Sequence, residues 1–203
     1  MKKAILLLTA FAGVLFLSFK PHGTITYRPD LEKSTVGWHA RKVTGEHMGN
    51  VKIKSGSIVV DHHAPSRGEF VIDMNSITCS DLKDAGYNAK LVNHLKSDDF
   101  FSVAKHPEAR LKIKSFTPIP GAKAGEANYT IKADLTIKGI TKEISFTAQM
   151  NVTDRMITAK AEIKIDRSEF DVRYGSGKFF DNLGDKLIYD EITISVDLTA
   201  VPN

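Results

Sequence analysis

The sequence predicts an all-β protein that folds as an antiparallel eight-stranded β-barrel with one short helix. Apolar and polar residues alternate along about eight segments, which is the period of strands with one buried face. Short clusters of Gly, Pro, Asn, Asp and Ser separate these segments, so consecutive strands are expected to pair as hairpins. A barrel is favoured over a sandwich because closure pairs every strand edge.

The N-terminal segment predicts an export signal over residues 1–20. Lys2 and Lys3 precede an uncharged run over residues 4–19, AILLLTAFAGVLFLSF, and Lys20 ends it. A short basic region before an apolar stretch is typical of a secretory signal peptide, and this stretch is shorter than the roughly 20 residues of a spanning helix. We therefore expect residues 21–203 to form one exported domain. Retention of the segment as an uncleaved anchor is the alternative.

The N-terminal half of that domain predicts several strands and the single helix. Trp38 lies in a first strand over residues 35–42, and the strands that follow show alternating or continuous apolar positions. Those positions are Val51, Ile53, Ile58, Val59, Val60, Phe70, Ile72, Met74, Leu111 and Ile113. Between residues 87 and 97 the apolar positions, such as Leu91 and Leu95, instead recur at the spacing of one helix face.

The C-terminal half predicts four strands with clear alternation. Their apolar faces are formed by Tyr129, Ile131, Ala133, Leu135 and Ile137; by Ile144, Phe146, Ala148, Met150 and Val152; by Ile157, Ala159, Ala161, Ile163 and Ile165; and by Ile188, Ile192, Ile194, Val196 and Leu198. An eight-stranded barrel is just wide enough to be filled by side chains or to hold one slim ligand. Small inward residues such as Ala159 and Ala161 are compatible with a channel and equally with a solid core in which they oppose large residues.

Composition and motifs exclude several classes of function. The net charge of +4 is too small to indicate a nucleic-acid partner. Cys79 is the single cysteine, which excludes an intramolecular disulfide and a cysteine-based structural zinc site. Neighbouring strand residues point to opposite faces, so His62 and His63 are expected to chelate poorly, and there is no HExxH motif. We therefore expect no metal site and no cofactor. We also expect no enzymatic activity, because no nucleophile motif is present and Cys79 lacks an evident activating partner.

Four segments together resemble the YceI-like family. They are residues 94–101, HLKSDDFF, with His106-Pro107 after them; residues 134–142, DLTIKGITK; residues 165–170, IDRSEF; and TVGW at 35–38 with HMG at 47–49. Their order and spacing agree with the family from about residue 24 to the C terminus. Two residues, Ala133 and Asp171, replace glycines of the family pattern, and the segment 173–186 is longer than its minimal form.

The resemblance implies a lipocalin-like barrel with a long apolar tunnel. It also implies an exported protein of the bacterial periplasm or envelope that holds a polyisoprenoid, or an isoprenoid quinone-like molecule, for shielding or transport. The candidate tunnel-lining residues are Trp38, Phe70, Ile72, Leu95, Phe101, Leu135, Ile137, Phe146, Ile163 and Ile165, and the candidates for the tunnel mouth are Phe179, Phe180 and Leu183. Asp166 and Arg167 either form an ion pair that fixes the barrel end or meet a polar ligand head group.

The expected partners follow from this interpretation. They are a hydrophobic small molecule as ligand, transient contact with a membrane or an envelope enzyme, and a second copy of the chain in a homodimer. Two other functions stay open. One is a scaffold or interaction module with a solid, ligand-free core, and the other is an enzyme that acts on a lipid or on an oxidised envelope component.

Overall fold

The computed structural model describes residues 23–203 as an antiparallel barrel, so the predicted export signal over 1–20 lies outside the described residues. The strands are β1 (Ile25–Pro29), β2 (Thr35–Lys42), β3 (Gly45–Asp61), β4 (Ala64–Asp73), β5 (Glu108–Pro118), β6 (Tyr129–Ile137), β7 (Ile140–Val152), β8 (Ile157–Asp166) and β9 (Ile188–Pro202). The helices are α1 (Ala85–Lys96) and three 3₁₀ turns, η1 (Met74–Ser76), η2 (Arg167–Phe170) and η3 (Gly184–Lys186).

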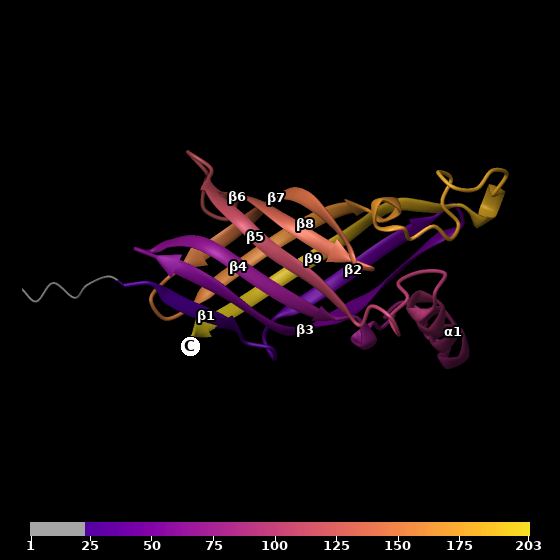
Figure 1. Ribbon diagram of the computed structural model, residues 1–203, viewed down its shortest axis with the longest axis horizontal. Coiled ribbons are helices and arrows are strands. Elements are labelled where there is room, and N and C mark those ends of the chain that lie inside the picture. The colour runs from indigo at the N-terminus through magenta and orange to yellow at the C-terminus, as the bar shows by residue number, and fades with distance from the viewer. Residues whose placement is uncertain (1–22) are drawn as a thin grey trace, which may run out of the picture.

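Eight of the strands form a closed ring, which confirms the predicted barrel. Each strand from β2 to β9 pairs antiparallel with the next, and β2 closes the ring by pairing with β9. The short strand β1 is additional: it pairs with β3 at one end of the barrel and with the last residues of β9. Figure 1 shows the strands crossing the barrel axis at a steep tilt, with the C terminus beside β1.

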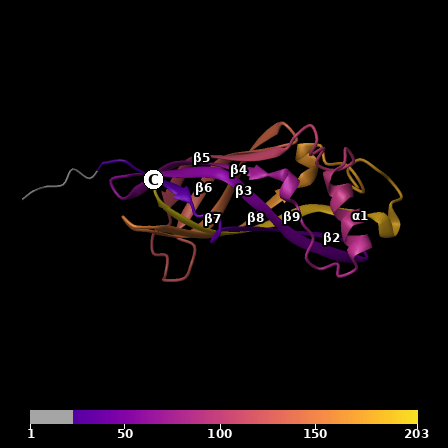
Figure 2. The same ribbon diagram turned by 90° about the horizontal axis from the view of Figure 1, so that it is seen from below.

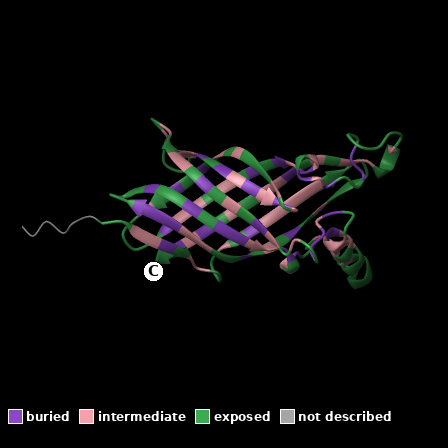
Figure 3. Cartoon of the chain, viewed as in Figure 1, coloured by how far each residue is buried: buried purple, intermediate pink, exposed green. Residues whose placement is uncertain are grey.

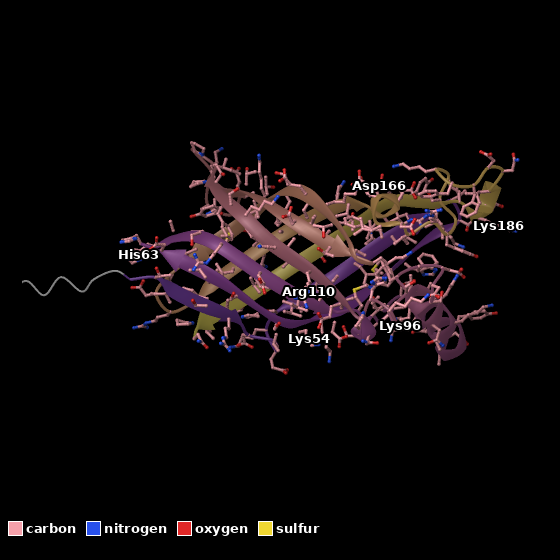
Figure 4. The ribbon with its side chains drawn as sticks, viewed as in Figure 1. Lys54, His63, Lys96, Arg110, Asp166 and Lys186 are labelled. Carbon is pink, nitrogen blue, oxygen red and sulfur yellow. The ribbon has the colours of Figure 1, made fainter. Side chains whose placement is uncertain are left out.

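The two ends of the barrel differ in what covers them. At one end lie β1, the C terminus and the β3–β4 turn that carries His63, whereas α1 stands at the other end, which we term the helix end (Figures 1, 2 and 4). The segment from η2 to β9 also projects at the helix end, where Asp166 and Lys186 are seen in Figure 4. None of the helices within residues 23–203 is long and apolar enough to cross a membrane.

The sequence pattern of each strand explains why the barrel wall has one buried and one exposed face. Buried and exposed residues alternate along the strands, as Figure 3 shows, because successive side chains point to opposite faces. The β6–β7 hairpin turns at Lys138 and Gly139, whose φ angles of 51° and 76° are those of a tight type I′ turn. His62 and His63 also have positive φ and form the β3–β4 turn, so the assumption that they lie on a strand was wrong.

Helix α1 begins two residues earlier than the sequence predicted and ends at Lys96 rather than at 97. The Asp84 side chain accepts a hydrogen bond from the Tyr87 N–H at 2.9 Å and so caps the first turn. Only Leu95 of α1 is buried, and it packs into the core of the barrel's helix end. The helix therefore covers this end and lies outside the barrel wall.

Candidate functional site

The barrel interior is packed at both ends and leaves a cavity between them. One core cluster consists of strand residues alone, including Tyr27 and Ile157, and lies towards β1. The other cluster lies at the helix end and includes loop and turn residues such as Phe100 and Phe170. Side chains between the clusters, such as Phe146, pack against both and are only partly buried because they face a cavity of about 220 Å³.

All ten residues that the sequence analysis proposed as tunnel-lining line this cavity. They come from five strands, α1 and the loop after α1, and they converge because each occupies an inward position of its element. Their placement matches the expected face of each strand. Whether they contact a ligand stays a prediction.

Further lining residues were not among the ten candidates, although the sequence analysis placed them on the apolar strand faces. They include Ile144, Ala161, Ile188, Ile192, Ile194 and Val196. Each stands two or four residues from another inward position on its own strand, so the alternation along β7, β8 and β9 had placed them on the inward faces. Phe100 is different, because it lies in the loop after α1 and no periodicity marks it.

Arg167 is the only charged residue among the described residues that line the cavity. Its side chain is 2% exposed, and its guanidinium donates hydrogen bonds to the backbone carbonyls of residues 172, 174, 188 and 189 at 2.8–3.3 Å. Its Nη2 also lies 3.3 Å from Asp190 Oδ1. Burial lowers the pKa of Arg167, and the negative charges of Asp190 and Asp166 oppose that change. The guanidinium is therefore held in place by the protein in the wall of the cavity.

The ion pair that the sequence suggested between Asp166 and Arg167 is replaced by two separate pairs. Asp166 accepts from the Ser168 N–H at the start of η2, and its carboxylate pairs with Lys178. Burial would raise the pKa of the Asp166 carboxyl, but the hydrogen bonds from Lys178 and Ser168 outweigh it, and the pKa lies below its ordinary value. The Lys178 pair fastens the segment after η2 to the end of β8, and the Asp190 pair joins η2 to the start of β9.

The candidates for the tunnel mouth lie outside the cavity. Phe179 and Phe180 are 41% and 50% exposed, and Leu183 is half-buried; all three belong to the segment between η2 and η3 at the helix end. The Arg173 guanidinium lies 5.0 Å from the centre of the Phe179 ring. None of the three lines the cavity, so a role at its entrance stays a prediction.

Comparison with known families identifies the domain. The sequence model of the YceI-like domain matches residues 27–200. A UPF0312 protein of Photorhabdus laumondii is 28% identical over 153 residues, which cover 74% of this chain and 73% of that protein. A UPF0312 protein of Pseudomonas putida is 27% identical over 103 residues, which cover 51% of this chain and 48% of that protein.

Solved structures share the fold. The crystal structure of Burkholderia cenocepacia BcnA matches with a TM-score of 0.66 and 24% identity, covering 85% of this chain and 99% of that one. A polyisoprenoid-binding domain from Saccharophagus degradans matches with a TM-score of 0.58 and 15% identity, covering 88% and 99%. A mutant YceI protein of Campylobacter jejuni matches with a TM-score of 0.54 and 21% identity, covering 74% and 82%. At these identities the likeness concerns the fold.

Proposed function

The chain belongs to the YceI-like family, and we propose that it binds one slim apolar lipid chain of the polyisoprenoid class inside its barrel. The observation that carries this proposal is the cavity itself. A solid core would leave no such space, and the described residues around it are apolar except for Arg167. The polyisoprenoid-binding domain with the same fold makes an isoprenoid the first ligand to test.

Burial of apolar surface supplies the binding energy in this account. Each methylene removed from water contributes about 0.8 kcal/mol, so a hydrocarbon chain needs no special polar partner. Among residues 23–203, those that line the cavity offer no hydroxyl, thiol, carboxylate or imidazole group, and their single guanidinium is engaged by backbone carbonyls and Asp190. We therefore propose binding rather than catalysis, with any charged head group of the ligand outside the cavity.

The volume of the cavity limits the length of chain that it can hold. A cavity of about 150 Å³ accommodates one benzene ring, so one of about 220 Å³ corresponds to roughly nine carbon atoms, or about two isoprene units. A longer chain must extend past one end. The helix end is the proposed exit, because its core cluster includes η1, α1, η2 and loop residues, whereas the opposite cluster consists of strand residues only.

The proposed setting is the bacterial cell envelope. The predicted export signal over residues 1–20 supports it, and an exported barrel would shield the lipid while the lipid crosses an aqueous compartment. Loading by transient contact with a membrane or an envelope enzyme, and a homodimer, are further parts of this proposal. Phe179 and Phe180 are the residues we propose to stand nearest to such a donor.

A chain-length series tests the proposal. Trp38 is the single tryptophan and lines the cavity, so its fluorescence reports on occupancy. We expect saturable binding of uncharged prenols, with affinity rising at least about tenfold per isoprene unit up to roughly two units and less steeply beyond. Fluorescence that does not change on addition of any prenol, or affinity that is independent of chain length, would contradict a hydrocarbon-binding cavity.

A further inference from the structure

His47, Cys79 and Asp81 bring three kinds of metal ligand together beside the turn of the β2–β3 hairpin. Their ligand atoms all lie within 4.8 Å of one another. His47 Nδ1 is 2.8 Å from Asp81 Oδ2, and Cys79 Sγ donates to Asp81 Oδ1 at 3.2 Å. The sequence analysis expected no metal site because no metal-binding motif is present. The pairing that brings these three residues together could not be foreseen from the sequence.

A short segment over residues 76–81, which we term the strap, creates this arrangement. The strap runs along the part of β3 that extends beyond the pairing with β4, and it hydrogen-bonds to it through backbone groups. The Thr78 N–H donates to the Asn50 carbonyl at 2.9 Å, and the Ser80 N–H donates to the Met48 carbonyl at 2.8 Å. This register places Cys79 and Asp81 beside His47 at the start of β3.

The donor set is one that zinc prefers. Thiolate, imidazole and carboxylate are its usual protein ligands, and three of them with a fourth position left to water is a common arrangement. In a tetrahedral zinc site, bonds of about 2.0–2.3 Å separate neighbouring ligand atoms by roughly 3.3–3.5 Å. The two hydrogen-bonded contacts, 2.8 and 3.2 Å, are shorter than that, and all three ligand atoms lie within 4.8 Å of one another, so an ion that replaces the bridging protons requires the three side chains to rearrange locally.

The three groups differ in exposure, and the two more exposed ones leave room for water beside a bound ion. Cys79 is 8% exposed, while the side chains of His47 and Asp81 are 31% and 25% exposed, so water can reach the outer side of the cluster. The Met48 N–H donates a hydrogen bond to Asp81 Oδ1 at 2.9 Å, and this bond fixes the orientation of the carboxylate. Burial raises the pKa of the Cys79 thiol, so an ion must displace its proton on binding.

We propose that His47, Cys79 and Asp81 bind one divalent cation of the zinc type and that the ion fastens the strap to β3. The consequence extends to α1, because the Asn88 side chain of that helix donates to the carbonyls of Cys79 and Leu82 at 2.9 Å each. An ion that fixes Cys79 thus also fixes the helix that covers the cavity's helix end. This site does not depend on which lipid the cavity binds.

Titration of the metal-free full chain with Co²⁺ tests the proposal, because a cobalt–thiolate bond absorbs in the near ultraviolet. We expect this band to saturate at one equivalent, to be absent in Cys79→Ser, and to disappear on competition with Zn²⁺. His47→Gln and Asp81→Asn should each weaken Co²⁺ binding at least about tenfold, since each removes one protein ligand. His39→Gln is the matched control, because His39 lies on the same β2–β3 hairpin, pairs with Glu46 at 2.9 Å and is not one of the three ligands, so its loss should leave the affinity unchanged.

Two results would contradict the proposed metal site. If the wild-type chain gives no thiolate band with excess Co²⁺, and its thermal midpoint does not rise with Zn²⁺, the metal site is contradicted. The three residues would then hold the strap by hydrogen bonds alone. A band that keeps its affinity in both His47→Gln and Asp81→Asn would place the ion elsewhere. Both results come from folded wild-type protein or from variants checked by circular dichroism, and neither depends on prenol binding.

Discussion

The indole Nε1 of Trp38 donates a hydrogen bond to the backbone carbonyl of Thr78 at 3.0 Å. Trp38 lines the cavity, and Thr78 belongs to the strap, whose Ile77 also lines it. The bond therefore connects the wall of the cavity to the segment that leads into α1. Because Trp38 is the single tryptophan, its fluorescence can report on the strap as well as on the cavity.

The strap requires a glycine beneath it at position 49. A Cβ atom at Gly49 would lie 1.8 Å from the Thr78 carbonyl oxygen and 2.9 Å from Trp38 Nε1. We expect Gly49→Ala to lower the free energy of unfolding by about 1–3 kcal/mol, because the strap must move away from β3. Urea denaturation followed by Trp38 fluorescence measures this. Gly23→Ala is the control, since nothing lies within 4 Å of its added Cβ; equal stability of both variants would contradict the close packing.

A large side chain at Ala161 should block the cavity without adding charge. Ala161 lies on β8, lines the cavity and is only partly buried. A phenylalanine ring there occupies the space of about four methylenes, so we expect Ala161→Phe to weaken prenol binding about 100-fold, equivalent to about 3 kcal/mol. The neighbouring Glu162 is exposed, and Glu162→Phe should bind prenols like the wild type. Similar affinities for the two variants would place the ligand outside the barrel.

The buried guanidinium of Arg167 should resist conservative replacement. A lysine has neither the number nor the planar arrangement of donors to serve four carbonyls and Asp190 together. We expect Arg167→Lys to lower the free energy of unfolding by about 3–5 kcal/mol, as measured by urea denaturation. In Arg167→Met, the additional change Asp190→Asn should recover part of the loss, because it removes the uncompensated charge. A loss below about 1 kcal/mol for Arg167→Lys would show that the carbonyl bonds contribute little.

The ion pair of Asp166 predicts a stability change in acid. The folded-state pKa of Asp166 lies below 3.8, its ordinary value. The ionised carboxylate therefore stabilises the fold above that ordinary value, and the stabilisation is lost as the pH falls through the lowered pKa. We expect the free energy of unfolding of the wild type, measured by urea denaturation, to exceed that of Asp166→Asn by the same amount at pH 7 and at pH 5, about 1 kcal/mol or less. This difference should shrink below pH 3.8. Asp181→Asn, in the exposed segment after η2, should follow the wild type throughout. A difference that persists unchanged in acid would contradict the ion pair.

Alternation was enough to predict the barrel and the inward faces of its strands. One face of each strand had to be apolar, and a slip of one residue would have exposed that whole face, so residues such as Leu135 and Ile163 could be placed from the sequence. The turn at Lys138-Gly139 was equally readable, because its left-handed backbone favours glycine. Asp171 also has a left-handed φ, of 58°, which explains why the family pattern has glycine there.

Contacts between segments without periodicity could not be predicted. The cluster of His47, Cys79 and Asp81 depends on the register between the strap and β3, and hydrogen bonds between irregular segments leave no repeat in the sequence. The partner of Asp166 was missed for the same reason, since Lys178 belongs to the irregular segment between η2 and η3, and the partner of Arg167, Asp190, stands near the start of β9 directly after that segment. The sequence thus predicted the strand residues that line the cavity, but not the contacts that hold the irregular segments at the helix end.

Organic extraction and mass spectrometry of natively purified protein test the central claim most directly. The account predicts one equivalent of an isoprenoid or related apolar chain in the wild type, and much less in folded Ala161→Phe protein prepared in the same way. A wild-type protein that yields no apolar molecule and takes up no added prenol would contradict the carrier function and favour an interaction module whose cavity stays empty.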